Sequence, residues 1–127
     1  DLANETFTVF DTKNNRDHTL PMTEDTRIMF NRRHNNDEAY VFTSPINSKR
    51  PMTASKTFKR VSEEVGFVFT AHDLRRTVAT VAAERGYDLS SVGAVLNHSR
   101  QGVTEGYIQR TLPRLKQILM DIEEELF

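Results

Sequence analysis

The C-terminal half of the chain places apolar residues at helical spacing, and this pattern constrains the fold more than any other feature. It predicts helices over His72–Arg85, from Asp88 or Ser90 to His98, and over Pro113–Phe127, with a short segment over Val103–Ile108. The residues expected to face inward are Leu74, Val78, Val81 and Ala82 in the first helix, Val92, Val95 and Leu96 in the second, and Leu115, Ile118, Leu119 and Ile122 in the last. Consecutive amphipathic helices predict a largely helical domain.

The N-terminal quarter has the composition of β-sheet. Residues Thr6–Asp11 and Arg16–Pro21 are rich in β-branched and aromatic side chains, which favours two strands. Asn tolerates positive φ, so Asn14-Asn15 predicts a tight hairpin turn with Lys13 at its tip. The chain is therefore expected to be α+β, mainly helical, with a small antiparallel sheet near the N-terminus.

The middle of the chain predicts two more helices. Thr23 can cap a helix that ends near Arg33, and Ser55–Val65 has helical apolar spacing with Gly66 as its stop. The apolar run Tyr40–Phe42 is expected to be a short buried strand. We find no internal repeat, so residues 1–127 are expected to form a single domain.

Length, charge and cysteine content exclude several classes of protein. The chain has 127 residues and no cysteine, which excludes disulfides and thiolate zinc sites. Its apolar stretches are too short for a membrane span. The net charge is -1, but residues 1–120 carry +3 because four acidic residues lie in the last seven. Overall charge therefore does not indicate a nucleic-acid partner.

Five residues could carry chemistry, although each alone has an ordinary structural explanation. His72 and Arg75, at a helix start, could be a cap and a surface charge, and His98 could interact with a helix dipole. Tyr107 could belong to the core, and Lys13 could be a solvated charge. Their order and spacing are more informative than any one of them.

The combined pattern resembles the catalytic domain of the tyrosine recombinase (phage integrase) family. It comprises a hairpin lysine, His72-Asp73-Leu74-Arg75, then Leu96-Asn97-His98-Ser99, and a tyrosine nine residues after His98. Arg75 and His98 are 23 positions apart, as is typical of the family. The resemblance covers essentially the whole chain and is densest from Thr70 to Arg110.

The resemblance implies site-specific DNA recombination, in integration or excision, through a 3′-phosphotyrosyl intermediate. It implies that Tyr107 is the nucleophile, that Arg75 and His98 bind the phosphate, and that His72 is a general acid/base. Lys13 would protonate the 5′-oxygen leaving group. Neither a metal nor another cofactor is expected, because the covalent intermediate conserves the energy of the broken bond.

Two departures from the family pattern affect these expectations. Asn97 stands where the family usually has glycine, and since asparagine also adopts the left-handed conformation, we expect the helix end to be preserved. The family also has a second arginine ahead of the hairpin lysine, but residues 1–12 contain none. We therefore expect a truncated catalytic domain without the N-terminal core-binding domain, inactive by itself.

The expected partner is double-stranded DNA, with a homo-oligomer assembled on it. Phosphate contacts are expected from Arg16, Lys49, Arg50 and Arg76. The C-terminal helix could pack on a neighbouring protomer, as is frequent in the family, or on its own domain. A family member of this kind would work in the cytoplasm or nucleoid of a bacterial cell.

Three alternatives remain at this stage. A non-catalytic helix-turn-helix DNA-binding module is one, although the segment from Asp88 to His98 is almost uncharged. A metallohydrolase using His72, Asp73 and His98 would need a set of ligands with suitable spacing. A type IB topoisomerase would share the tyrosine chemistry, but the short interval between Arg75 and Tyr107 favours a recombinase.

Overall fold

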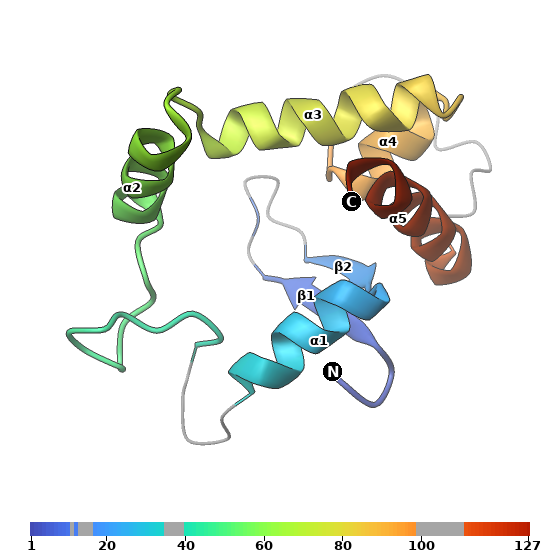
Figure 1. The fold of residues 1–127 in the computed structure, drawn as a ribbon. Coiled ribbons are helices and arrows are strands. Elements are labelled where there is room, and N and C mark those ends of the chain that lie inside the picture. Colours follow the sequence, from blue (N-terminus) through green and yellow to red (C-terminus); the bar gives the residue numbers. More distant parts are fainter. Residues whose placement is uncertain (11, 13–16, 35–39, 99–110) are drawn as a thin grey trace.

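A computed structural model gives the arrangement of the chain and describes residues 1–10, 12, 17–34, 40–98 and 111–127 (Figure 1). In chain order its elements are β1 (Thr6–Val9), β2 (His18–Pro21), α1 (Glu24–Arg33), α2 (Ser55–Val65), α3 (Ala71–Glu84), α4 (Leu89–Val95) and α5 (Leu112–Leu126). The described residues are thus mainly helical, with a two-stranded antiparallel sheet, and the predicted α+β class is confirmed. The segment expected over Val103–Ile108 lies outside the described residues.

The two N-terminal strands form the predicted hairpin, with both strands shorter than expected. Thr6 pairs with Pro21 and Val9 pairs with His18. On one face the hydroxyls of Thr8 and Thr19 are 2.8 Å apart, within hydrogen-bonding distance. The turn predicted at Asn14-Asn15 lies outside the described residues.

Local sequence signals set the ends of several helices. The Thr23 hydroxyl accepts a hydrogen bond from the Thr26 backbone N–H at the start of α1, and Asp88 caps α4 through the N–H groups of Ser90 and Ser91. Gly66 ends α2 with φ +80°, a left-handed conformation that glycine adopts without a steric penalty. These boundaries follow from short-range hydrogen bonding, which explains why the sequence predicts them well.

The hydrophobic core lies where α3, α4 and α5 meet β2 (Figure 1). Its buried apolar side chains are Leu20, Val81, Ala82, Val92, Ala94, Val95, Leu96, Leu115, Ile118 and Ile122. Ile118, at the centre of α5, is 1% exposed. The predicted inward faces of α4 and α5 are therefore confirmed, with Leu119 partly buried against the core.

Helix α5 packs on its own chain, and polar contacts add to the apolar ones. The Thr23 hydroxyl donates to the Glu123 carboxylate, and the Tyr87 hydroxyl donates to Asp121 at 2.5 Å. Because the phenol binds a carboxylate, the pKa of Tyr87 is raised. Of the two predicted arrangements of the C-terminal helix, the structure has the one within the chain, while assembly of several protomers on DNA stays a prediction.

Three expectations about single segments are wrong. Tyr40–Phe42 is an exposed bend rather than a buried strand: its side chains stay exposed although the Arg33 guanidinium lies over the Phe42 ring at 5.6 Å, and Thr43 forms an isolated bridge to Pro51. Leu74 is 50% exposed, because the first turns of α3 extend beyond the core toward α2 (Figure 1). Helix α4 ends at Val95 instead of His98.

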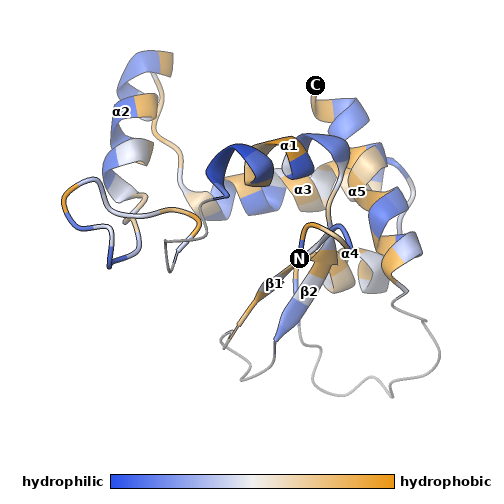
Figure 2. Cartoon of the chain, turned by 90° about the horizontal axis from the view of Figure 1, so that it is seen from below, coloured by the Kyte–Doolittle hydropathy of each residue, from blue (hydrophilic) through white to orange (hydrophobic). Residues whose placement is uncertain are grey.

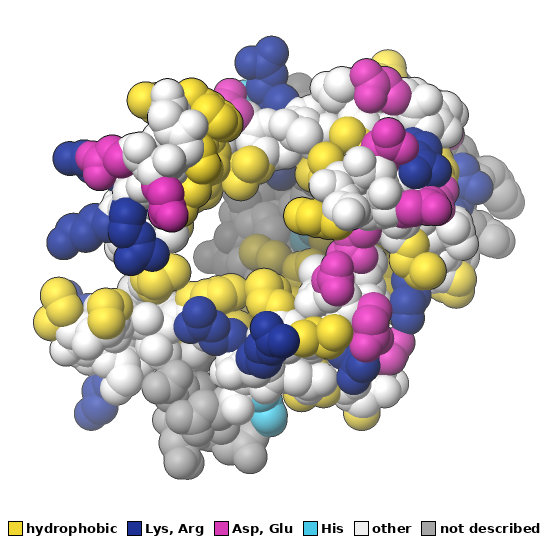
Figure 3. Space-filling model, viewed as in Figure 1, with side chains coloured by type: hydrophobic (Ala, Val, Ile, Leu, Met, Phe, Trp, Pro, Cys, Tyr) yellow, Lys and Arg dark blue, Asp and Glu magenta, His cyan; other side chains and the backbone are white. Residues whose placement is uncertain are grey.

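Helix α2 stands apart from the sheet and from α5 in both ribbon views (Figure 1, Figure 2). Hydrophobic side chains line one flank of α2, and Lys and Arg side chains lie on its outer flank (Figure 3). Val65 and Phe67 are exposed, and Val68 is 88% exposed. None of the helices in the described residues has the length and hydrophobicity of a membrane span.

Candidate active site

The end of helix α4 presents His98 on a sharp left-handed turn. Asn97 has φ +52°, so the predicted left-handed conformation at this position is confirmed. The backbone N–H of His98 donates to the carbonyl of Gly93 at 2.9 Å, five residues back. This bond and the left-handed residue before it are the features of a Schellman motif. His98 therefore lies just past the helix, at a position fixed by the backbone.

Arg75 on α3 contacts this turn directly. Its Nε–H donates to Nε2 of His98 at 3.3 Å, and an Nη–H donates to the carbonyl of Leu96. The last carbonyls of a helix lack intrahelical partners and lie at the negative end of the helix dipole, so a guanidinium is favourable there. The structure thus brings together a guanidinium and an imidazole that are 23 residues apart in sequence.

His72 lies in the first turn of α3, three residues before Arg75. Side chains three positions apart share one face of a helix, so His72 and Arg75 are neighbours on α3. His72 is exposed. Thr70 and Asp73 form a capping box, in which the Thr70 N–H donates to Asp73 Oδ2 at 2.9 Å and the Asp73 N–H donates to Thr70 Oγ1 at 3.3 Å. The cap fixes the turn that carries His72.

This capping box makes the stability of α3 depend on pH. The hydrogen bonds from Thr70 lower the pKa of Asp73 below its ordinary value of 3.8. A lowered folded-state pKa means that the stabilisation is complete above the unfolded pKa and is lost as pH falls through the folded pKa. We expect Asp73→Asn to lower the free energy of unfolding at pH 7, and the difference from wild type to shrink below about pH 4.

Urea denaturation at pH 7 and pH 3 measures this difference. Asp25→Asn is the matched control, because Asp25 also lies in the first turn of a helix but is not part of a capping box. Asp25→Asn also removes a negative charge near the N-terminus of a helix, so it measures the general effect of losing such a charge. A difference between Asp73→Asn and wild type that stays constant over this pH range would contradict the assignment.

The hairpin is attached to the same end of α4 at two points. Nδ2 of Asn97 donates to the hydroxyl of Thr12 at 3.0 Å. The ring Nε2 of His18 on β2 lies 3.1 Å from the carbonyl oxygen of Val95, to which it donates. Thr12 and His18 are not among the candidate residues predicted from the sequence, because no local pattern marks a contact between residues 85 or 77 positions apart.

The other candidate residues fall into two groups. Lys13, Arg16 and Tyr107 lie outside the described residues. Lys49 and Arg50 are exposed in the turn that the Thr43–Pro51 bridge closes, and Arg76 is exposed on α3. The loop with Lys49 and Arg50 lies near α2, well away from α4 (Figure 1, Figure 2), so the structure does not bring these two residues to the Arg75–His98 pair.

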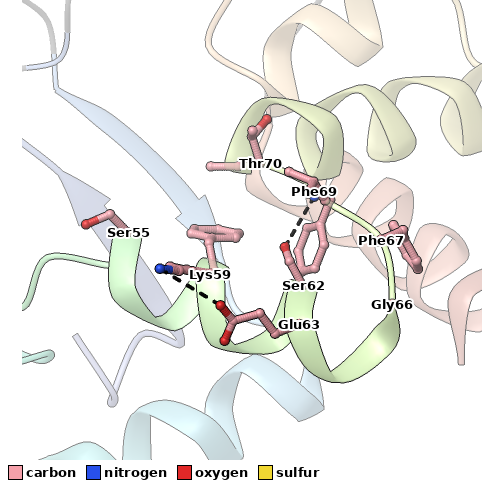
Figure 4. Close-up of a pocket in the computed structure, with 11 residues that line it drawn as sticks. Ser55, Lys59, Ser62, Glu63, Gly66, Phe67, Phe69 and Thr70 are labelled. Carbon is pink, nitrogen blue, oxygen red and sulfur yellow. Dashed lines mark hydrogen bonds and ion pairs between the residues drawn. The ribbon is translucent and has the colours of Figure 1, made fainter.

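A pocket of about 730 Å³ lies between α2 and the start of α3 (Figure 4). Its lining includes three phenylalanines, with Phe58 and Phe67 both close to Phe69, at ring-centroid distances of 5.6 and 5.8 Å. The Phe69 backbone N–H donates to the hydroxyl of Ser62 at 3.3 Å. The pocket reaches Thr70 and Ala71 but includes neither Arg75 nor His98, so it is separate from the candidate site.

The described part of the candidate site has hydrogen-bond donors suited to an anion. Among the described residues, no three His, Asp or Glu side chains form a group that could hold a metal ion. His72, Asp73 and His98 therefore do not form the ligand set that a metallohydrolase would need. A guanidinium beside an imidazole, by contrast, can donate several hydrogen bonds to the oxygens of one phosphate.

Comparisons with known proteins match the sequence of this chain to one family. The phage integrase family matches residues 1–112. Tyrosine recombinase XerA of Pyrococcus furiosus is 30% identical over 118 residues, which cover 87% of this chain and 41% of that protein. A XerC-like tyrosine recombinase of Caldanaerobacter subterraneus is 29% identical over 93 residues, which cover 72% of this chain and 24% of that protein.

The chain therefore spans less than half the length of these curated relatives. No solved structure matches it significantly. The family match extends over both strands and from α1 to α4, so it includes Arg75, His98 and the turn that holds them together. On this basis, the chain belongs to the phage integrase family.

Proposed function

We propose that this chain is the catalytic part of a tyrosine recombinase that breaks and rejoins DNA at specific sites. The observation that carries the proposal is the contact between Arg75 and His98, which joins α3 to the end of α4 at 3.3 Å. Two of the five guanidinium N–H groups of Arg75 make the two described contacts. The other three suffice to hold two oxygens of a phosphate.

The proposed reaction conserves phosphodiester energy in a covalent intermediate. The Tyr107 hydroxyl attacks the phosphorus, forms a 3′-phosphotyrosyl bond and releases the 5′-oxygen, which takes a proton from Lys13. His72 takes the proton of the phenol as a general base. A 5′-hydroxyl of another strand then attacks the phosphotyrosine and frees the tyrosine. Arg75 and His98 stabilise the charge that develops on the phosphate oxygens.

The partner in this proposal is double-stranded DNA in the cytoplasm or nucleoid of a bacterial cell, where protomers assemble on a recombination site. Arg16, Lys49, Arg50 and Arg76 would contact phosphates, which positions DNA without reading its sequence. Burial of Ser91–Leu96 in the core supports recombination over a helix-turn-helix module, because a recognition helix must expose one face to a DNA groove.

A covalent trapping experiment tests the proposal. The chain, extended at its N-terminus by the natural upstream sequence, is incubated with nicked duplexes whose arms are randomised. When the DNA is cleaved beside the nick, the strand that carries the new 5′-hydroxyl dissociates, and the protein remains covalently bound to the DNA. We expect a protein–DNA adduct at Tyr107, identified by mass spectrometry of the linked peptide, and no adduct with Tyr107→Phe.

The 127-residue chain by itself should give at least about 100-fold less adduct, since residues 1–12 supply no second arginine for the phosphate. An adduct of equal yield with Tyr107→Phe would overturn the proposed nucleophile. Salt-sensitive, sequence-specific DNA binding without any adduct would favour the helix-turn-helix alternative instead.

A further inference from the structure

Asn97 makes a contact that a glycine at this position could not make. Two properties of asparagine are used here: it tolerates the φ of +52°, and its side-chain amide donates to the hydroxyl of Thr12 at 3.0 Å. Glycine, the residue usual in the family at this position, would provide only the first property. The contact is therefore a feature of this chain and is not required for the turn itself.

The contact joins two segments that carry proposed catalytic residues. Thr12 directly precedes Lys13 in the sequence, and Asn97 directly precedes His98. Because His98 Nε2 accepts a hydrogen bond from Arg75, the direction in which the chain leaves Asn97 also affects the Arg75–His98 pair. The bond from His18 to the Val95 carbonyl oxygen holds the other strand of the hairpin to the same helix end.

We propose that Asn97 is a positioning residue that couples the hairpin to the turn holding His98 in place beside Arg75. The inference rests on the proposed function, because it assigns Asn97 a role toward the same phosphate site. It predicts that removing the Asn97–Thr12 hydrogen bond loosens the contact between Arg75 and His98, although neither residue is altered. If the Asn97–Thr12 hydrogen bond only stabilised the fold, its removal would leave the tautomer of the His98 ring unchanged.

The tautomer of His98 is the readout. When Nε2 accepts from Arg75, the proton of the neutral ring is on Nδ1, and the ¹⁵N chemical shifts of the ring distinguish this tautomer from the other. The 127-residue chain, labelled at histidine and without DNA, is measured at pH 8 as wild type, Asn97→Gly, Thr12→Val and the double variant. Thr12→Ser retains the hydroxyl and is the conservative control.

In Asn97→Gly and in Thr12→Val, we expect the ratio of the Nδ1–H tautomer of His98 to its other tautomer to fall at least about twofold. A twofold change is the smallest that the loss of one net hydrogen bond is expected to cause. The double variant should show no further change, because both substitutions remove the same interaction. Thr12→Ser should match wild type. Amide spectra confirm that each variant is folded, and if Asn97→Gly is not, Thr12→Val and Thr12→Ser decide the question.

Unchanged His98 shifts in Thr12→Val would overturn the coupling, as would strictly additive effects in the double variant. The measurement involves no DNA and no reaction, so it is independent of the covalent trapping experiment. If no adduct is trapped but the His98 tautomer ratio changes as expected, only the proposed function is overturned. A Tyr107 adduct with unchanged His98 shifts would overturn the role of Asn97 alone.

Discussion

Arg75→Ala, in the protein extended by its natural upstream sequence, is expected to form the Tyr107–DNA adduct about 100- to 1000-fold more slowly than wild type. The guanidinium is proposed to donate to the phosphate oxygens as they gain charge, and alanine leaves no donor at that position. Single-turnover cleavage of a nicked substrate, followed on a denaturing gel, measures the rate. DNA binding by gel shift distinguishes a loss of chemistry from a loss of affinity.

Two further variants make the Arg75 prediction specific. Arg75→Lys keeps the charge but lacks the planar fork, so we expect it to remain at least about tenfold slower than wild type. Arg32→Ala, which removes an exposed arginine in the last turn of α1, is the matched control and should be close to wild type. A similar rate loss in Arg32→Ala and Arg75→Ala would indicate a general effect of charge, and would contradict a specific role for Arg75.

Ile118→Ala is expected to have the largest effect on stability, lowering the free energy of unfolding by about 2–5 kcal/mol. Ile118 is 1% exposed and lies where α5 packs against α3, α4 and β2. The substitution removes buried apolar surface and leaves a cavity among close-packed neighbours. Since domains are stable by only about 5–15 kcal/mol, the loss is a large fraction of the total.

Chemical denaturation followed by circular dichroism measures this loss. Met120→Ala is the matched control on the same helix, because Met120 is 48% exposed and should change the free energy of unfolding by less than about 1 kcal/mol. Equal destabilisation by the two variants would mean that helix propensity, and not burial against the core, determines how α5 contributes to stability.

Local sequence predicts the helices of this chain because their ends depend on short-range chemistry. Asp88 caps α4 through the two N–H groups that follow it, and Gly66 ends α2 because it adopts a left-handed conformation freely. The left-handed turn at Asn97 was predictable for the same reason. Each of these signals involves residues at most a few positions apart.

Burial was harder to predict, because it depends on what covers a segment. Leu74 continues the apolar stripe of α3, but it lies in the first turns of the helix, which extend beyond the core toward α2, and it is exposed (Figure 1). Tyr40–Phe42 is apolar in sequence, but it is exposed, and the contact described over the Phe42 ring is the guanidinium of Arg33. A hydrophobic pattern states which residues can be buried, and the arrangement of the other elements decides which of them are.

The helical segments, the hairpin and the order of candidate residues that resembles the phage integrase family are all predictable from the amino-acid sequence alone. The contacts of Arg75 with His98, of Asn97 with Thr12 and of His18 with the Val95 carbonyl are seen only in the folded chain. The partners in these contacts are 23, 85 and 77 positions apart. A hydrogen bond forms between side chains that packing brings within about 3 Å, and no short-range pattern encodes which helix end a distant hairpin will meet.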